Sequence, residues 1–267
     1  MKKIYIAFLA MMLCACTSQA QKDNGDLLKP SVAKEPTVKT MESNVKPSTA
    51  AETTKDKSTA SPAESIGKTA RLLALQGFVN VKDADSSIYV SLMYSRPDNF
   101  CGVTLYDDLK EAYLHPKAIK AIVKAQQYLK SLRPDLSLII YDASRPMHIQ
   151  QKMWDKVKNT NKSKYVSNPA HGGGMHNYGM AVDISLCTLG GDSIDMGTKV
   201  DYMGSAAHID QEQQLVAQGK ISRQARKNRL LLRKVMKHAG WIPLRTEWWH
   251  FNLCSRKTAK TYYKVIK

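Results

Sequence analysis

Residues 172–183 read Gly-Gly-Gly-Met-His-Asn-Tyr-Gly-Met-Ala-Val-Asp, and the remainder of the chain is organised around this stretch. It sets an imidazole, His176, and a carboxylate, Asp183, among glycines that allow the backbone to turn tightly. These two residues are seven positions apart, so a single straight strand would direct their side chains to opposite faces. We therefore expect His176 in a loop ahead of a strand that carries Asp183, with Gly174 and Gly179 permitting the bend.

A second group of polar residues lies near the C-terminus, where residues 247–250 read Glu-Trp-Trp-His. Polar residues of either group by themselves more often belong to an ordinary loop than to a metal site. Together they supply two imidazoles, one ligating carboxylate and one spare carboxylate, the donor set of a catalytic zinc site with an open fourth position. This pattern points to His176, Asp183 and His250 as ligands, with Glu247 free to act as general base.

A further charged pair follows a short apolar run, residues 136–141, which predicts a buried strand. The strand delivers Asp142 and Arg145 at its end, just before Pro146. The planar guanidinium of Arg145 suits a carboxylate or a developing oxyanion, and Asp142 could hold it in place. The alternative is a purely structural ion pair that stabilises the turn before Pro146.

Hydrophobic periodicity and helix-boundary residues predict the other elements. Strands are expected over residues 88–94 and 180–186, helices over residues 116–132, 147–157 and 222–237, and a hairpin over residues 241–253. This order predicts an α+β fold, a mostly antiparallel sheet flanked by helices, in a single domain over residues 68–267.

The N-terminus reads as an export signal: a basic start, an apolar run over residues 4–13, and then Leu-Cys-Ala-Cys ending at Cys16. The ending resembles a bacterial lipobox, which implies a signal peptide over residues 1–15 and a lipid on Cys16. An ordinary signal peptide is the alternative. Thr17, rather than Asp, after the lipidated cysteine makes the outer membrane the default destination.

Residues 16–67 are rich in Lys, Glu, Ser, Thr, Ala and Pro without a periodic apolar face, which predicts a disordered tether. Charges nearly balance there, so most of the net charge of +17 belongs to the folded part. A basic surface suggests nucleic acid, but export favours anionic wall polymer or lipid headgroups, or a merely solvated surface. The spacing of Cys101, Cys187 and Cys254 argues against a cysteine zinc site and leaves their pairing open.

Five elements, in order, resemble the VanX-type zinc D-alanyl-D-alanine dipeptidases and related D,D-carboxypeptidases. Residues 174–183 are similar to the signature S-x-H-x-x-G-x-A-x-D, and residues 247–250 to the element E-x-W-H. The features similar to the dipeptidase branch are Tyr94 with Asn99-Phe100-x-Gly102, Asp142-x-x-Arg145-Pro146, and Met196-Gly197-Thr198 with Asp201.

The resemblance implies a zinc peptidase domain that holds one Zn²⁺ through His176, Asp183 and His250. Glu247 would be the general base and then the general acid, while Arg145, oriented by Asp142, would stabilise the oxyanion. Asp201 would receive the substrate's ammonium group, and Tyr94 and Gly174 would also belong to the substrate site.

Gly174 departs from the family pattern because it stands where the signature has serine. In the family that serine helps to hold the substrate's C-terminal carboxylate. We expect the backbone N–H groups of residues 172–174 to be able to substitute for it.

These features predict a lipid-anchored enzyme on the periplasmic side of a bacterial cell envelope that hydrolyses D-Ala-D-Ala or a similar wall-derived dipeptide. One alternative is a D,D-carboxypeptidase or endopeptidase that trims peptidoglycan stem peptides. The other is a non-enzymatic wall-binding lipoprotein. The expected partners are the peptide and, through the lipid alone, a membrane, with no nucleic acid.

Overall fold

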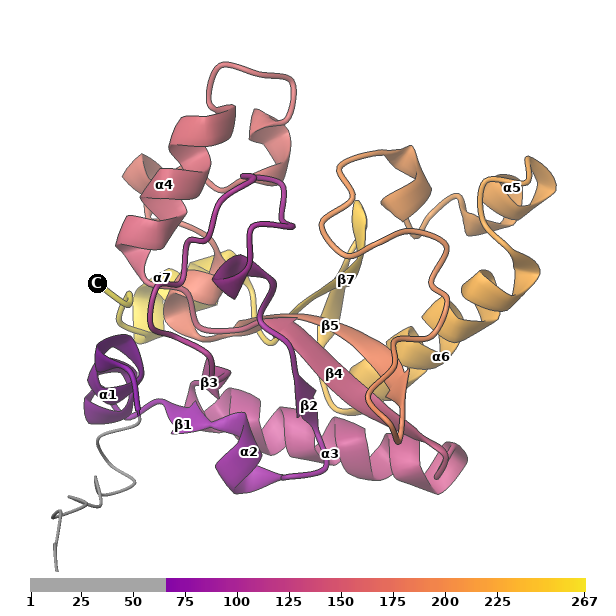
Figure 1. Cartoon of the computed structure of the whole chain (residues 1–267), viewed down its shortest axis with the longest axis horizontal. Coiled ribbons are helices and arrows are strands. Elements are labelled where there is room, and N and C mark those ends of the chain that lie inside the picture. Colours follow the sequence, from indigo (N-terminus) through magenta and orange to yellow (C-terminus); the bar gives the residue numbers. More distant parts are fainter. Residues whose placement is uncertain (1–65) are drawn as a thin grey trace, which may run out of the picture. The chain divides into compact units, whose positions relative to one another are not determined.

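A computed structural model of the protein describes residues 66–267. The predicted signal peptide, Cys16 and nearly all of the predicted tether lie outside these residues. The described part is an α+β domain in which helices surround one five-stranded sheet, as predicted (Figure 1). Within the same residues, no helix has the length and apolar character needed to cross a membrane.

The sheet has the strand order β2-β4-β5-β7-β6 and is mostly antiparallel. Only the pair of β2 (Tyr89–Val90) with β4 (Leu136–Asp142) is parallel. Antiparallel pairs join β4 to β5 (Ala181–Thr188), β5 to β7 (Glu247–Asn252), and β7 to β6 (Ile242–Leu244). β4 and β5 are buried at almost every position, so both faces of the central sheet are covered by other elements.

The remaining elements frame this sheet. A separate two-stranded sheet pairs β1 (Val79–Asn80) with β3 (Tyr113–Leu114). The helices are α1 (Lys68–Leu75), α2 (Val81–Ala84), α3 (Pro116–Leu132), α4 (Met147–Val157), α5 (Glu212–Ala217), α6 (Arg223–His238) and α7 (Arg256–Tyr262). The short 3₁₀ helices are η2 (Met93–Ser95), η3 (Ser163–Tyr165), η4 (Pro169–His171), η5 (Met175–Tyr178) and η6 (Ser205–Ala207).

The three long helices begin and end close to their predicted positions. Pro116 occupies the first turn of α3, and the Ser222 hydroxyl caps α6 by accepting a hydrogen bond from the Ala225 N–H at 2.8 Å. Gly240 follows α6 with a φ of +91°, the left-handed conformation that commonly ends a helix. α3 and α6 pack against each other and against the sheet, while α4 lies on the other side of the sheet (Figure 1).

The first predicted strand is the main difference between expectation and structure. Alternation over residues 88–94 predicts a strand, but only Tyr89–Val90 pairs with β4. The chain then turns into η2, because the Tyr94 carbonyl accepts hydrogen bonds from the N–H groups of Leu105 and Tyr106 instead of joining the sheet. This turn buries Tyr94 and places it in the lining of the cavity that His176 and His250 also line. The C-terminal helix α7 was not predicted.

A fully buried arginine fastens the segment between β5 and α6. Arg229, which is 0% exposed, donates hydrogen bonds to the carbonyl groups of Met196 at 2.7 Å and Ala206 at 3.0 Å. Its guanidinium also lies 5.5 Å from the ring of Trp248 in β7. The segment is thereby held against the strand that carries His250.

Candidate metal and catalytic site

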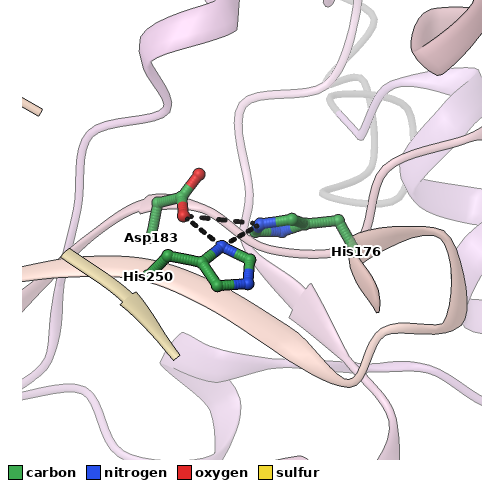
Figure 2. Close-up of side chains that lie close together, drawn as sticks. All are labelled: His176, Asp183 and His250. Atoms are coloured by element: carbon green, nitrogen blue, oxygen red, sulfur yellow. Dashed lines mark hydrogen bonds and ion pairs between the residues drawn. The ribbon is translucent and has the colours of Figure 1, made fainter. Parts of the chain in front are cut away.

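The three predicted metal ligands come together from three elements (Figure 2). His176 lies in η5, ahead of β5, as the sequence predicted. Asp183 in β5 and His250 in β7 are direct partners in the antiparallel register, which brings their side chains to one face. His176 Nε2 lies 3.4 Å from Asp183 Oδ1 and 3.2 Å from His250 Nδ1, and the last two atoms are 3.0 Å apart.

These distances match the geometry of a tetrahedral zinc site. With bonds of about 2.0–2.1 Å to nitrogen and oxygen, two ligand atoms on a tetrahedron lie roughly 3.3–3.4 Å apart. The three side-chain atoms, separated by 3.0–3.4 Å, therefore form one face of such a tetrahedron. A zinc ion held by these three atoms would have a fourth position for a water or a substrate atom, and all three residues line one cavity.

The second nitrogen of each imidazole has its own partner. His176 Nδ1–H donates to the Ala143 carbonyl at 2.8 Å, and His250 Nε2–H donates to Asn252 Oδ1 at 2.9 Å. Such bonds hold the tautomer and ring orientation of ligating histidines. They leave His176 Nε2 and His250 Nδ1 as the atoms directed at the metal position.

The charges within the cluster also suit a cation. Burial disfavours charge on Asp183, but His176 and the hydrogen bond from His250 outweigh this and hold the pKa of the carboxyl well below its usual range. Burial likewise opposes charge on His176, yet Asp183 raises the pKa of this imidazole. The Asp183 carboxylate is therefore ionised. A metal ion bound to the cluster would displace the proton that the histidines share with it.

Glu247 lies beside the ligands although strand geometry alone would not put it there. Residues three apart in a regular strand face opposite sides, but the register of β6 with β7 is irregular between Pro243 and Leu244. Glu247 Oε2 thus lies 4.0 Å from His250 Nδ1. Burial, against the opposing effect of His250, raises the pKa of Glu247 to about 7, a suitable value for a base at neutral pH.

Arg145 is both part of a structural pair and part of the cavity wall. Its Nε donates to Asp142 Oδ2 at 3.1 Å, Nη2 pairs with the same oxygen, and Nη1 donates to Gln150 Oε1 at 2.8 Å. Asp142 also accepts a 2.6 Å hydrogen bond from the Tyr106 hydroxyl. Three of the five guanidinium N–H groups are used in these contacts, which leaves two for a ligand in the cavity that Arg145 lines.

Asp201 and Tyr94 form a second pair in the cavity. The Tyr94 hydroxyl lies 3.2 Å from both carboxylate oxygens of Asp201, and the Arg145 guanidinium lies 5.1 Å from the Tyr94 ring. Burial and the nearby Asp183 raise the pKa of Asp201 to about 7. Asp201 is also the only non-glycine residue among residues 66–267 with a positive φ, at 68°, a strained conformation typical of functional sites.

One cavity of about 470 Å³, within the range of small-molecule sites, is lined by the three predicted ligands and by Tyr94, Arg145, Asp201 and Glu247, while Asp142 lies outside its lining. Gly174 also lines it, but its own N–H and that of Gly172 have partners within the chain. The Gly174 N–H donates to Asn177 Oδ1 at 2.8 Å, and the Gly172 N–H donates to the Pro169 carbonyl at 2.8 Å. Two of the three N–H groups expected to bind substrate are therefore already used inside the chain.

Two residues of the site were missed from the sequence. Asn252 lies two positions after His250 and so faces the same side of β7, a signal that strand periodicity contains. Gln150 accepts from Arg145 at 2.8 Å and lies in the first turns of α4, for which the sequence offers no comparable signal. The cysteines of the described part, Cys101, Cys187 and Cys254, are unpaired.

Comparison with known proteins adds independent information. The sequence model of the family described as Peptidase_M15, D-ala-D-ala dipeptidase, matches residues 74–267. The D-alanyl-D-alanine dipeptidase of Escherichia coli (strain K12) is 31% identical over 164 residues, which cover 61% of this chain and 78% of that protein. The D-alanyl-D-alanine dipeptidase of Enterococcus faecalis (strain ATCC 700802 / V583) is 26% identical over 203 residues, which cover 70% of this chain and 96% of that protein.

Proposed function

The chain belongs to the Peptidase_M15 family of D-ala-D-ala dipeptidases, and from this premise we propose that it hydrolyses D-Ala-D-Ala-type dipeptides with one Zn²⁺ and Glu247 as general base. The protein is a peptidase, so the non-enzymatic wall-binding alternative is not retained. The observation that carries the zinc proposal is the triangle of ligand atoms, with sides of 3.0, 3.2 and 3.4 Å, opening onto the cavity.

His176 Nε2, Asp183 Oδ1 and His250 Nδ1 would hold the ion. Zn²⁺ in a site of this kind polarises a carbonyl oxygen and lowers the pKa of a bound water to about 7. The chain's own contribution is to supply one negative and two neutral ligands, held by Ala143 and Asn252, beside a cavity that a dipeptide can enter.

Glu247 moves the proton. Its carboxylate takes the proton of the attacking water as the water oxygen bonds to the carbonyl carbon of the scissile amide. When the C–N bond breaks, the protonated Glu247 passes that proton to the leaving amine, and two free amino acids result. A pKa of about 7 allows the same group to accept and to return a proton near neutral pH.

Arg145 stabilises the oxygen that becomes negative in the transition state. Its two unused N–H groups are available to that oxygen, while Asp142 and Gln150 keep the guanidinium from moving. Loss of one such donor from an oxyanion hole typically costs about 10²–10³ in kcat. The structural and functional interpretations of the Asp142–Arg145 pair are thus compatible.

Asp201 and Tyr94 bind the ammonium group of the dipeptide. Among residues 66–267, Asp201 and Glu247 are the only carboxylates that line the cavity without belonging to the ligand set. Because a bound ammonium favours the charged carboxylate, the substrate itself lowers the pKa of Asp201 from about 7. Tyr94 orients this carboxylate through its hydroxyl.

The test is an assay of the full-length protein loaded with Zn²⁺, offered free D-Ala-D-Ala beside a pentapeptide stem that ends in the same pair. Release of alanine from the free dipeptide alone is expected. Release from the pentapeptide would establish the stem-trimming alternative. No release from either, with zinc bound, would overturn the proposal.

We also propose that the enzyme works at the cell envelope, anchored by a lipid on Cys16. The support is the sequence of the N-terminal segment, which lies outside the described residues. The strongly basic balance of the chain, 40 basic against 23 acidic residues, suits a neighbourhood of anionic polymer or lipid.

A further inference from the structure

The cavity has two sides that differ in charge. Figure 1 shows α4 and the segment after it on one side of β5, and the segment between β5 and α5 on the other. Asp201 comes from the second segment, and Asp183 and Glu247 come from the sheet between. The lining residues from 150–176 and 252–256 include no carboxylate, and they include Arg256.

Ser167 is a hydroxyl on this carboxylate-free side. It lines the cavity, and its Oγ makes no hydrogen bond with any other group of residues 66–267. Its carbonyl accepts a 2.8 Å hydrogen bond from Gln150 Nε2, and Gln150 Oε1 in turn accepts from Arg145 Nη1 at 2.8 Å. The backbone of Ser167 is therefore held in a defined position relative to Arg145.

Gly174 provides the space that the Ser167 hydroxyl occupies. A Cβ added at Gly174 would lie 2.9 Å from Ser167 Oγ and 3.3 Å from Ser167 Cβ, closer than side chains normally approach. The backbone does not require glycine here, because its φ of −104° is open to any residue. The lack of a side chain at position 174 and the hydroxyl at position 167 are thus complementary.

We propose that the Ser167 hydroxyl donates a hydrogen bond to the C-terminal carboxylate of the substrate, so that the dipeptide lies with its ammonium at Asp201 and its carboxylate on the opposite side of the cavity. This inference rests on the proposed dipeptidase function and names the residue that binds the C-terminal carboxylate of the substrate. Arg256, whose Nη2 donates to the His171 carbonyl at 3.0 Å, adds a positive charge on the same side. Free acids would therefore be preferred over amides.

The test compares D-Ala-D-Ala with D-Ala-D-alaninamide, which lacks the terminal charge. The measured quantity is the ratio of kcat/KM for the acid to kcat/KM for the amide. In Ser167→Ala this ratio should fall about tenfold or more, as expected for loss of a hydrogen bond to a charged group, with the change mainly in KM for the acid. Ser163→Ala, a serine of the same segment outside the cavity lining, should keep the wild-type ratio.

An exchange of the two positions makes the test sharper. The double variant Ser167→Gly with Gly174→Ser returns a hydroxyl to the same space from position 174. Its ratio of kcat/KM for the acid to kcat/KM for the amide should return most of the way to the wild-type value. Gly174→Ser alone should lower activity on the acid, because its side chain meets Ser167 Oγ.

An unchanged ratio in Ser167→Ala, with dipeptide hydrolysis intact, would overturn this inference and leave the dipeptidase proposal standing. A wild-type protein that cleaves neither compound would overturn both.

Discussion

Asp183 and His250 are direct cross-strand partners of β5 and β7, and Asp183 Oδ1 lies 3.0 Å from His250 Nδ1. Two of the three ligand positions are therefore set by backbone hydrogen bonds between neighbouring strands rather than by a mobile loop. The third, His176, is tied to the Ala143 carbonyl at 2.8 Å. A site held in this way needs little rearrangement to receive a metal ion.

Replacing Glu247 separates metal binding from turnover. Glu247→Gln keeps the shape of the side chain but cannot accept a proton, so kcat should fall roughly 10²–10⁴-fold while one Zn²⁺ per chain is retained. The measurement pairs zinc content with turnover of D-Ala-D-Ala. A variant with wild-type turnover would show that another group is the base.

Asn252 is expected to act on the metal through His250. Asn252→Ala removes the acceptor 2.9 Å from His250 Nε2, and loss of such a partner typically weakens metal binding or activity by about 10–100-fold. Competition with a chelator measures the zinc affinity. Asn168→Ala, which removes the acceptor for the Ala170 N–H at the start of η4 but no hydrogen bond to any imidazole of the described residues, should leave that affinity unchanged, and equal affinities in both variants would contradict the assignment.

Asp201 should make the stability of the metal-free protein depend on pH. Its pKa of about 7 in the folded protein lies above its usual value near 3.8, so the folded state binds this proton more tightly than the unfolded chain does. The stability gained from this proton is therefore fully present below about pH 4 and is lost as pH rises through 7. Asp201→Asn should have a Tm close to wild type at pH 4 and a higher Tm at pH 8. The same variant should bind dipeptide more weakly at neutral pH, because the carboxylate for the ammonium group is gone.

Thermal unfolding across this pH range provides the measurement. The prediction fails if the difference in Tm between the variant and wild type is constant from pH 4 to pH 8. In the Asp201→Asn variant, Glu247, whose pKa is also raised to about 7, should still make Tm fall as pH rises through 7.

Arg229 is expected to support the site through the segment that carries Asp201. Arg229→Leu leaves the Met196 and Ala206 carbonyls without their donor. It also removes the more distant of the two arginines beside Glu212, 3.8 Å away, while Arg233 keeps its pair with this carboxylate. Leaving a buried hydrogen-bonding group unpaired costs about 1–3 kcal/mol of unfolding free energy, and this variant leaves two such carbonyls. Urea unfolding measures this cost, and the exposed Lys227→Leu in the same helix should change it by less than about 0.5 kcal/mol.

Cys16 is expected to determine where the protein is found. Cys16→Ser should move it from the membrane fraction to the soluble fraction of bacterial cells and abolish incorporation of labelled fatty acid. Cys14→Ser, two positions earlier, should change neither. Membrane recovery of the Cys16→Ser protein equal to that of wild type would contradict the lipid-anchor proposal.

Much of the fold was accessible from local sequence patterns. α3, α4 and α6 combine apolar periodicity with defined ends, such as Ser222 before α6 and Gly240 after it, and these signals depend on neighbouring residues only. The strand over residues 88–94 was overpredicted because alternation does not reveal when a chain leaves a sheet. Tyr94 leaves it to accept hydrogen bonds from residues more than ten positions away.

By itself, the sequence determined the residue types at the site, since two imidazoles and two carboxylates within recognisable motifs restrict the chemistry. The tertiary structure alone decided how these groups meet. The 3.0–3.4 Å triangle, the position of Glu247 over an irregular strand pair, and the fit of Ser167 into the space at Gly174 all depend on packing between distant segments. Local patterns describe which face a side chain takes, but the distance between two side chains follows from the register and twist of the strands and the close packing of the interior.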